Sequence, residues 1–233
     1  DDNFGSDYQR AMKIFDLIIN SDIKINIYLG NGLRGDNIDH TFIDKMVKAG
    51  VILVVLPIET ASPRLQKFIK KNINLERVAD NIHYACEKKI MVSTVIMAGF
   101  PTETQEEIIQ SIEFLKQFKK ITYPHFFTVK YFPGTEIYNW ALKNNFNLNN
   151  LRKAVGVAVH KMKYSATPLI PTRNFRELHF KYLQEVFLIK ERLQNALEVQ
   201  KLFLTEDEIL DVYSLYFVKR IKDIQKDVLN YAT

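Results

Sequence analysis

Residues 90–104 read Ile-Met-Val-Ser-Thr-Val-Ile-Met-Ala-Gly-Phe-Pro-Thr-Glu-Thr, and this stretch decides the fold. It begins as a continuous apolar and β-branched run, which Gly99 and Pro101 end abruptly. Thr104 and Glu107 then have the spacing of a capping box in front of an apolar run with helical periodicity. The stretch therefore predicts a buried strand, a tight glycine turn and a helix. A strand that is apolar on both faces is typical of a parallel sheet covered by helices.

The glycine turn is also the first candidate for a binding site. In parallel α/β folds, ligands bind at the carboxyl ends of the strands. Gly99 would stand at such an end, and a residue without a side chain lets a ligand approach the backbone closely. We expect the backbone at Gly99 to lie near a small molecule.

The same alternation of strand and helix extends from the first residues to about residue 144. The predicted strands cover residues 25–29, 51–56, 90–98 and 126–132. The predicted helices cover residues 6–20, 39–49, 63–89 with a break near 72–74, and 104–118, and a further helix runs through residues 137–142. Units of this kind recur about every 30 residues in parallel α/β proteins. The strands are too few for an eight-stranded barrel, so we expect either a partial TIM-like (βα) barrel or an open sheet.

The alternation ends near residue 146, which suggests two regions: residues 1–145 as a partial barrel and residues 146–233 as a mainly α-helical C-terminal region. Residues 151–162 fit a helix or a strand, and Pro168 and Pro171 mark a linker. Residues 174–203 and 205–231 are predicted as two long helices, the second opened by the capping box of Thr205 and Glu208.

Composition narrows the class of protein. The chain has 233 residues, 47% of them hydrophobic, and a net charge of +5, as an ordinary globular protein has. Its lysines are scattered, which favours solvated faces over a nucleic-acid partner. No apolar run approaches the roughly 20 residues that span a bilayer, and no signal peptide is visible. We expect no membrane partner and a cytoplasmic location.

Cysteine and histidine usage excludes several kinds of site. Cys86 is the single cysteine, so the chain has no internal disulfide framework and no cysteine-only metal site. We expect Cys86 to be a buried structural thiol. The five histidines show no zinc-binding spacing, and no metal site is predicted. The chain opens at Asp1 without an initiator Met, and we interpret it as a piece of something longer.

Polar or turn-forming residues follow each expected strand end. Asp2 resembles the end of a strand whose body lies upstream, and Arg34, Glu59 and Gly99 follow the first, second and third visible strands. In a parallel barrel these positions share one rim. Each has a structural alternative: Asp2 could cap the first helix, Arg34 could pair with Asp36, and Glu59 could sit at a helix start. Taken together, they favour a small-molecule site.

Five motifs occur in order along the chain. They are Asp-Asp-Asn-Phe at 1–4, Gly-Leu-Arg-Gly-Asp at 32–36, Lys-Ala-Gly-Val-x-x-Val-x-x-Pro-Ile-Glu-Thr-Ala-Ser at 48–62, Met-Ala-Gly-Phe-Pro-Thr-Glu-Thr at 97–104 and Tyr-Phe-Pro-Gly-Thr-Glu-Ile-Tyr at 131–138. This succession resembles radical S-adenosylmethionine (radical SAM) enzymes, most closely the subgroup with an upstream cobalamin-binding domain. The resemblance covers about residues 1–142 and implies a partial (βα)6 barrel that holds SAM across its strand ends.

The resemblance implies roles for four polar residues. Asp2 falls where the family meets the amino group of SAM. Arg34 and Glu59 match positions that contact its ribose or carboxylate, and Lys71 matches a basic position facing the carboxylate. These roles agree with the chemistry, because a zwitterionic amino acid needs a carboxylate for its amine and a cation for its carboxylate.

Four further residues correspond to strand ends in the same family. Ile96 and Gly99 lie in the fifth-strand segment, which packs on the adenine, and Phe132 and Pro133 lie at the end of the sixth strand. The resemblance further implies a small-molecule substrate and an electron donor such as flavodoxin or ferredoxin.

The chain departs from the family at the cluster. The motif Cys-x-x-x-Cys-x-x-Cys, which binds the 4Fe-4S cluster after the first strand, is absent, and Cys86 cannot replace three thiolates. The first strand and most of the second are absent too. We therefore expect this chain to be the SAM-holding part of an enzyme whose cluster ligands lie in a missing N-terminal part, and to be inactive alone.

Three hypotheses remain open from the sequence. The first is a radical SAM enzyme that reductively cleaves SAM to a 5′-deoxyadenosyl radical and, where cobalamin is bound, carries out a methylation or rearrangement. The second is a non-catalytic binding or interaction module with a degenerate half-barrel. The third is an α/β enzyme of another kind that uses Glu59 as an acid or base.

Overall fold

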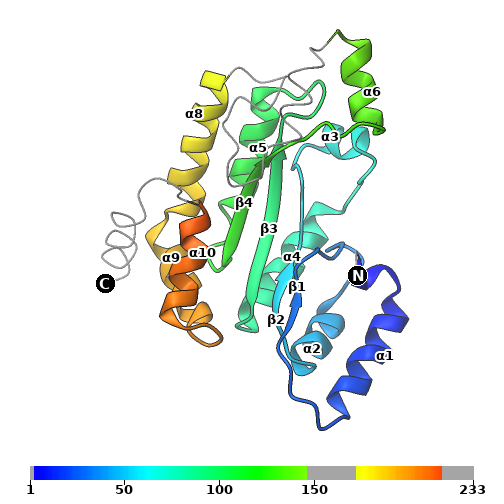
Figure 1. The fold of residues 1–233 in the computed structure, drawn as a ribbon, viewed down its shortest axis with the longest axis vertical. Helices are drawn as coiled ribbons and strands as arrows, with labels where there is room; N and C mark the ends of the chain where they lie inside the picture. The colour runs from blue at the N-terminus through cyan, green and yellow to red at the C-terminus, as the bar shows by residue number, and fades with distance from the viewer. Residues whose placement is uncertain (1–2, 146–171, 217–233) are drawn as a thin grey trace.

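A four-stranded parallel sheet forms the centre of the computed structural model, which describes residues 3–145 and 172–216 (Figure 1). The strand order is β1-β2-β3-β4, and every neighbouring pair is parallel. The strands are β1 (Ile27–Leu29), β2 (Val51–Val55), β3 (Met91–Ala98) and β4 (Tyr123–Thr128). Because every neighbouring pair is parallel, the carboxyl ends of all four strands lie at the same end of the sheet. This is an α/β fold consistent with a partial TIM-like barrel, as the sequence predicts.

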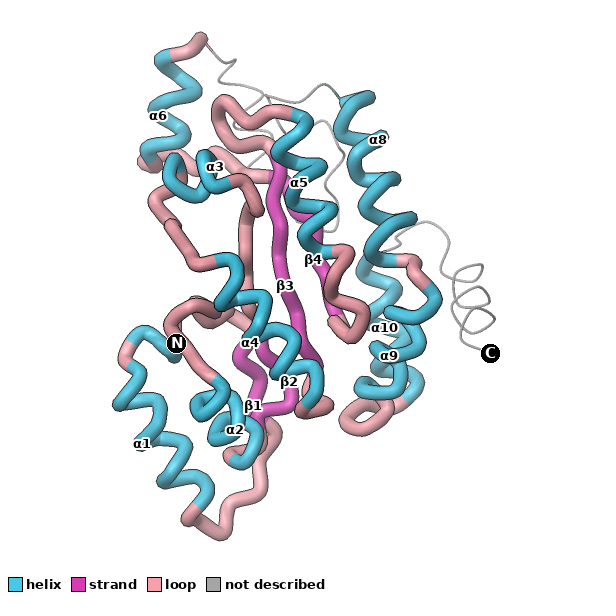
Figure 2. The backbone as a smooth tube through the Cα atoms, turned by 180° about the vertical axis from the view of Figure 1, so that it is seen from behind, coloured by secondary structure: helices cyan, strands magenta, loops and turns pink. Residues whose placement is uncertain are grey.

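Helices precede β1 and follow each of the four strands. They are η1 (Phe4–Ser6), α1 (Tyr8–Ile19), α2 (His40–Lys48), α3 (Pro63–Phe68), α4 (Leu75–Glu87), α5 (Gln105–Leu115), α6 (Glu136–Lys143), α8 (Thr172–Tyr182), the π-helix η4 (Leu183–Phe187), α9 (Lys190–Gln200) and α10 (Glu206–Tyr216). Seen from behind, α2, α4 and α5 lie across one face of the sheet (Figure 2). α8, α9 and α10 stand beside β4, and α3 and α6 lie beyond the carboxyl end of β3 (Figure 1).

Polar side chains cap the amino ends of most of these helices. The Asp39 carboxylate accepts a hydrogen bond from the Phe42 amide at the start of α2. At α5 both halves of the capping box form, because Thr104 Oγ1 accepts from the Glu107 amide and Glu107 Oε2 accepts from the Thr104 amide. The predicted break in residues 63–89 is confirmed, since α3 ends before and α4 begins after residues 72–74.

The main core lies between the sheet and its helices. It includes Val54, Val92 and Ile96 from the strands and Phe42 and Ile112 from the helices, all fully buried. The C-terminal helices contribute to the same cluster through side chains of α8, η4, α9 and α10. Within the described residues, the barrel region and the helical region therefore share one continuous apolar core.

The fourth strand is displaced from its predicted position of 126–132. β4 begins at Tyr123 and ends at Thr128, which pairs with Ala98, the last residue of β3. Gly99 turns away with φ +100°, so the chain beyond Val129 has no neighbouring strand to pair with. The partner strand decides where β4 ends, and residues 129–132 are irregular because β3 has already ended.

The predicted single helix over 174–203 is wrong. α8 passes into the π-helix η4, the chain is extended at Ile189 (φ −66°, ψ 124°), and α9 begins anew. The predicted helix over 205–231 is seen as α10 up to residue 216, with the capping box of Thr205 and Glu208 in place. The expectations for 151–162, 168–171 and 217–231 lie outside the described residues.

Candidate functional site at the carboxyl ends of the strands

The loop after β1 is fixed by Arg34. The Arg34 guanidinium pairs with the Asp36 carboxylate, with 2.9 Å between Nε and Oδ1. It also donates to the main-chain oxygens of Lys71 at 2.8 Å and Asn72 at 3.2 Å. The structural alternative for Arg34, an ion pair with Asp36, is therefore present. The same side chain ties the loop after β1 to the tight turn after α3.

The segment after β2 carries Glu59 in an unusual backbone conformation. Glu59 has φ +65°, a left-handed value that costs a residue with a side chain about 1–3 kcal/mol. Its backbone still pairs with β3, because it forms a bridge with Ile96 and its oxygen accepts from the Met97 amide at 2.7 Å. The side chain of buried Gln66 donates to the main-chain oxygens of Ile58 and Thr60, on either side of Glu59, and so fixes this segment.

Glu59 and Lys71 form an ion pair beside this strand end. Lys71 Nζ lies 2.6 Å from Glu59 Oε1, and the two side chains keep 23% and 20% of their surface exposed. The pair is therefore accessible to a ligand at the carboxyl ends of the strands. One anion and one cation stand together, as the recognition of a zwitterionic amino acid requires.

The turn after β3 is held from two sides at Gly99. The Gly99 amide donates to Glu103 Oε2, and the Phe100 amide donates to the same oxygen at 3.1 Å. The Gly99 oxygen accepts from the Tyr131 hydroxyl at 2.7 Å. Burial raises the pKa of Glu103 to about 7 and raises the pKa of Tyr131 above its ordinary value. Both the amide and the oxygen of Gly99, the residue that follows β3, therefore form hydrogen bonds within the protein.

α3 and α5 brace the same turn from outside. The Arg64 guanidinium donates to Glu107 Oε1 and Oε2 and to the main-chain oxygen of Thr102. Ser62 also donates to Glu107. The hydrogen bonds from Arg64 and then Ser62 lower the pKa of Glu107 to about 2, so this carboxylate is ionised at neutral pH. The turn is thus tied to two helices as well as to its own strand.

Phe132 and Pro133 lie beyond the end of β4 and before α6. Phe132 is about half exposed, and its oxygen accepts from the Thr135 amide and hydroxyl. Neighbouring Tyr131 reaches back to Gly99, so this segment adjoins the end of β3. Phe132 is therefore next in the chain to a residue that contacts Gly99, although β4 itself ends at Thr128.

We call Arg34, Glu59, Lys71, Gly99 and Tyr131 the strand-end rim. Hydrogen bonds and backbone pairing connect them in sequence, from Arg34 through Lys71 to Glu59, then along β3 to Gly99 and on to Tyr131. The structure therefore brings together four of the predicted site positions, Arg34, Glu59, Lys71 and Gly99. Which ligand they contact stays a prediction.

Among the other predicted positions, Ile96 stands apart from this group. The side chain of Ile96 is fully buried in the main core, so only its backbone lies next to Glu59. Asp2 lies outside the described residues.

The structure adds Gln66, Glu103 and Tyr131, none of which is predicted as a site residue from the sequence. Glu103 had a local signal, because a carboxylate four residues after a turn glycine can reach back to its amide. Gln66 and Tyr131 had no such signal, since their partners lie on other segments of the chain.

The residues of this chain do not fit an iron–sulfur cluster. A cubane cluster needs several thiolates, and Cys86 is the only cysteine in the sequence. Cys86 is buried in α4 as a free thiol, as predicted, and burial raises its pKa to about 12. Within the described ranges, no three histidine, cysteine or acidic side chains gather as metal ligands.

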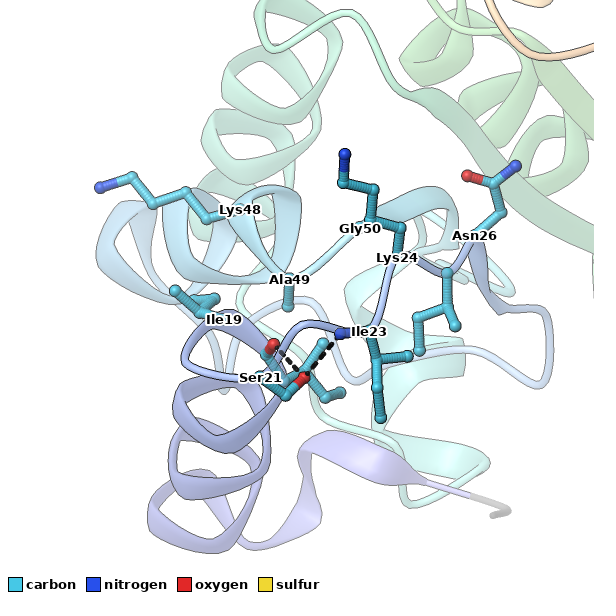
Figure 3. A pocket seen from close by; sticks show the side chains of 10 residues that line it. Ile19, Ser21, Ile23, Lys24, Asn26, Lys48, Ala49 and Gly50 are labelled. Carbon is cyan, nitrogen blue, oxygen red and sulfur yellow. Dashed lines mark hydrogen bonds between the residues drawn. The ribbon is translucent and has the colours of Figure 1, made fainter.

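A hollow of about 450 Å³ lies at the opposite end of the sheet (Figure 3). Its lining comes from the end of α1, from the loop that leads into β1, and from the turn before β2, and includes Ile19, Lys24, Lys48 and Gly50. Since Gly50 directly precedes β2, this hollow is at the amino ends of the strands. It is separate from the strand-end rim.

In the described part of the chain, no helix has both the length and the apolar character needed to cross a bilayer.

Comparison with known proteins gives two findings. Residues 4–115 match the family model of the radical SAM superfamily, a range that contains β1 to β3 and the Gly99 turn. The chain is also 33% identical over 159 residues to a Pyrococcus horikoshii protein described as an uncharacterized methyltransferase. The aligned part is 65% of this chain and 34% of that protein, so the chain spans about a third of the length of the curated relative it matches. The strand-end rim thus lies largely within the part of the chain that is similar to radical SAM proteins.

Proposed function

We propose that this chain is the SAM-holding part of a radical SAM enzyme. The observation that carries the proposal is the Glu59–Lys71 ion pair at the carboxyl ends of parallel strands. The pair lies in the range that matches the superfamily. Glu59 offers an acceptor to an amine or to ribose hydroxyls, and Lys71 offers a cation to a carboxylate. The Gly99 turn lies next to them along β3.

Arg34 supports this site indirectly in the proposal. Its guanidinium is engaged by Asp36 and by the oxygens of Lys71 and Asn72. It therefore holds the Lys71 turn in place, and Lys71 meets the ligand. This differs from direct contact between Arg34 and SAM, which the resemblance implies.

The cluster and the substrate belong to the longer protein in this proposal. Since the chain offers no set of thiolates, cysteines outside it would ligate the 4Fe-4S cluster, and an electron donor such as flavodoxin or ferredoxin would reduce it. The relative described as an uncharacterized methyltransferase supports methyl transfer as the reaction class. A small-molecule substrate is part of the proposal and rests on the motif resemblance. Cobalamin as a further cofactor is part of the same proposal and rests on the motif resemblance.

The test is SAM binding to the full-length encoded protein with its cluster reconstituted, measured by equilibrium dialysis. Replacing Glu59 or Lys71 with Ala should weaken SAM binding at least tenfold, because each removal leaves one charge of the zwitterion without a partner. The cluster absorbance should be unchanged. Lys70→Ala is the matched control, since Lys70 is the adjacent lysine and pairs with exposed Glu136 instead.

Two results would contradict the proposal. The first is wild-type affinity in both Glu59→Ala and Lys71→Ala. The second is the absence of Cys-x-x-x-Cys-x-x-Cys from the encoded residues upstream of Asp1, which would favour a non-catalytic binding module.

A further inference from the structure

The side chains of Glu59 and Lys71 have each other as their partner. Lys71 Nζ lies 2.6 Å from Glu59 Oε1, and within residues 3–145 and 172–216 neither side chain forms a further hydrogen bond or ion pair. A ligand that uses Glu59 as its acceptor and Lys71 as its cation therefore competes with this contact.

The main chain on both sides of the ion pair is anchored without help from the two side chains. The Glu59 oxygen accepts from the Met97 amide at 2.7 Å, which ties it to β3. The Lys71 amide donates to the Gln66 oxygen at 3.0 Å, and the Lys71 oxygen accepts from Arg34 at 2.8 Å. Either side chain can therefore change its partner while its backbone stays in place.

The neighbouring charges are engaged elsewhere. Asp36 pairs with Arg34, and Glu136 pairs with Lys70 at a site where both side chains are largely exposed. These four charges therefore do not replace either member of the ion pair, and a ligand that separates the pair supplies the new partners.

Separating the pair carries a cost that depends on burial. Ion pairs between fully exposed side chains contribute little, because water solvates the separated charges almost as well. About four-fifths of the side-chain surface of Glu59 and of Lys71 is buried, so water replaces the lost partner less completely here. A charge left alone at this place is unfavourable.

This cost falls differently on different ligands. The amino-acid end of SAM brings an ammonium and a carboxylate, so it can satisfy both members of the pair at once. Decarboxylated SAM keeps the adenosine, the sulfonium and the amine, but it has no anion to offer Lys71. Whatever it gains at Glu59 is offset by the loss of the ion pair.

We propose that the Glu59–Lys71 ion pair determines specificity by partner exchange: a ligand with a zwitterionic amino-acid end replaces both partners together, and a ligand that lacks the carboxylate is selected against because it leaves Lys71 alone. The inference rests on the proposed function, because it takes SAM as the ligand of this pair. It goes beyond that function by naming the analogue that the site rejects and the side chain that rejects it.

The test measures binding of SAM and of decarboxylated SAM to the full-length encoded protein with its cluster reconstituted. Lys71→Met should weaken SAM about tenfold or more, since the carboxylate loses its cation. The same substitution should strengthen decarboxylated SAM about threefold or more, because Glu59 is no longer held by Lys71. Lys70→Met is the matched control and should leave both affinities unchanged, since Lys70 pairs with Glu136.

The opposite directions distinguish partner exchange from damage to the fold, which would weaken both ligands. Should Lys71→Met fail to fold, Lys71→Gln gives the same comparison. Weaker SAM together with unchanged or weaker decarboxylated SAM would overturn this inference alone. Wild-type affinity for SAM in Lys71→Met would overturn it as well, and the same result in Glu59→Ala would overturn the proposed function with it.

Discussion

At the scale of single residues, Glu103 links stability to pH in a direction that can be measured. Burial raises its pKa from 4.5 to about 7, so between these values the folded protein holds a proton that the unfolded chain has released. Its contribution to stability is therefore full below pH 4.5 and is lost as the pH rises to 7. Glu103→Gln removes the titration.

We therefore predict that Glu103→Gln is more stable than the wild type at pH 8, by up to about 3 kcal/mol from the size of the shift. The two proteins should differ little at pH 4.5. Urea unfolding at both pH values measures this. A stability difference that is the same at pH 4.5 and pH 8 would show that the carboxyl is not shifted.

Gly50 is the glycine that the backbone most clearly requires. It has φ +96°, and a Cβ there would lie 2.3 Å from the Ile25 oxygen, a main-chain atom that cannot give way. Gly50→Ala should lower the free energy of unfolding by at least about 2 kcal/mol. Gly30→Ala is the control, because its Cβ would meet nothing within 4 Å. Equal thermal midpoints for the two variants would contradict the placement of the loop before β1 over Gly50.

Sequence reasoning succeeds at this scale where the partner is close in the chain. The Thr104–Glu107 box joins residues three positions apart, and its spacing alone predicts it. The Arg34–Asp36 pair joins residues two positions apart and is the structural alternative that the sequence offers for Arg34. The contacts of Gln66 and the reach of Tyr131 to Gly99 depend on how separate segments meet. No local pattern encodes them.

At the scale of elements, the docking of α9 depends on one buried arginine. Arg192 is 1% exposed, and its guanidinium donates to the main-chain oxygens of Phe187 and Thr122 at the start of β4. A buried arginine satisfied by carbonyls joins the π-helix, α9 and the sheet.

Arg192→Met should destabilise this joint by about 3 kcal/mol, since it leaves buried carbonyl oxygens without donors. Hydrogen exchange should then quicken in residues 187–200 and 119–124 and stay unchanged at β1 and β2. Glu191→Gln, an exposed neighbour on the same helix, is the control. Uniformly faster hydrogen exchange over the whole chain would show instead that the C-terminal helices and the sheet unfold together.

Element boundaries were the least predictable feature. The apolar content of residues 126–132 suggests a strand, yet β4 ends where β3 stops offering partners. Residues 174–203 have helical periodicity throughout, and the break at Ile189 has no Pro or Gly to announce it. The error at β4 arises because the neighbouring strand β3 decided the outcome over local propensity.

At the scale of the molecule, the parallel order of the strands could be predicted, because strands apolar on both faces alternate with helices of the right length. The order places the glycine turn, the ion pair and the loop after β1 at one edge of the sheet. The hollow lined by Gly50 lies at the other edge and had no sequence signal. The sheet thus has candidate binding regions at both the carboxyl ends and the amino ends of its strands. The proposed SAM site is at the carboxyl ends only.

The placement of SAM at the carboxyl ends can be measured by hydrogen–deuterium exchange of the full-length protein with and without SAM. We expect slower exchange on adding SAM in residues 57–60, 70–73 and 96–104, at the carboxyl ends of the strands, with no change in residues 18–26 and 48–50. Protection confined to 18–26 and 48–50, or no protection in this chain, would contradict it.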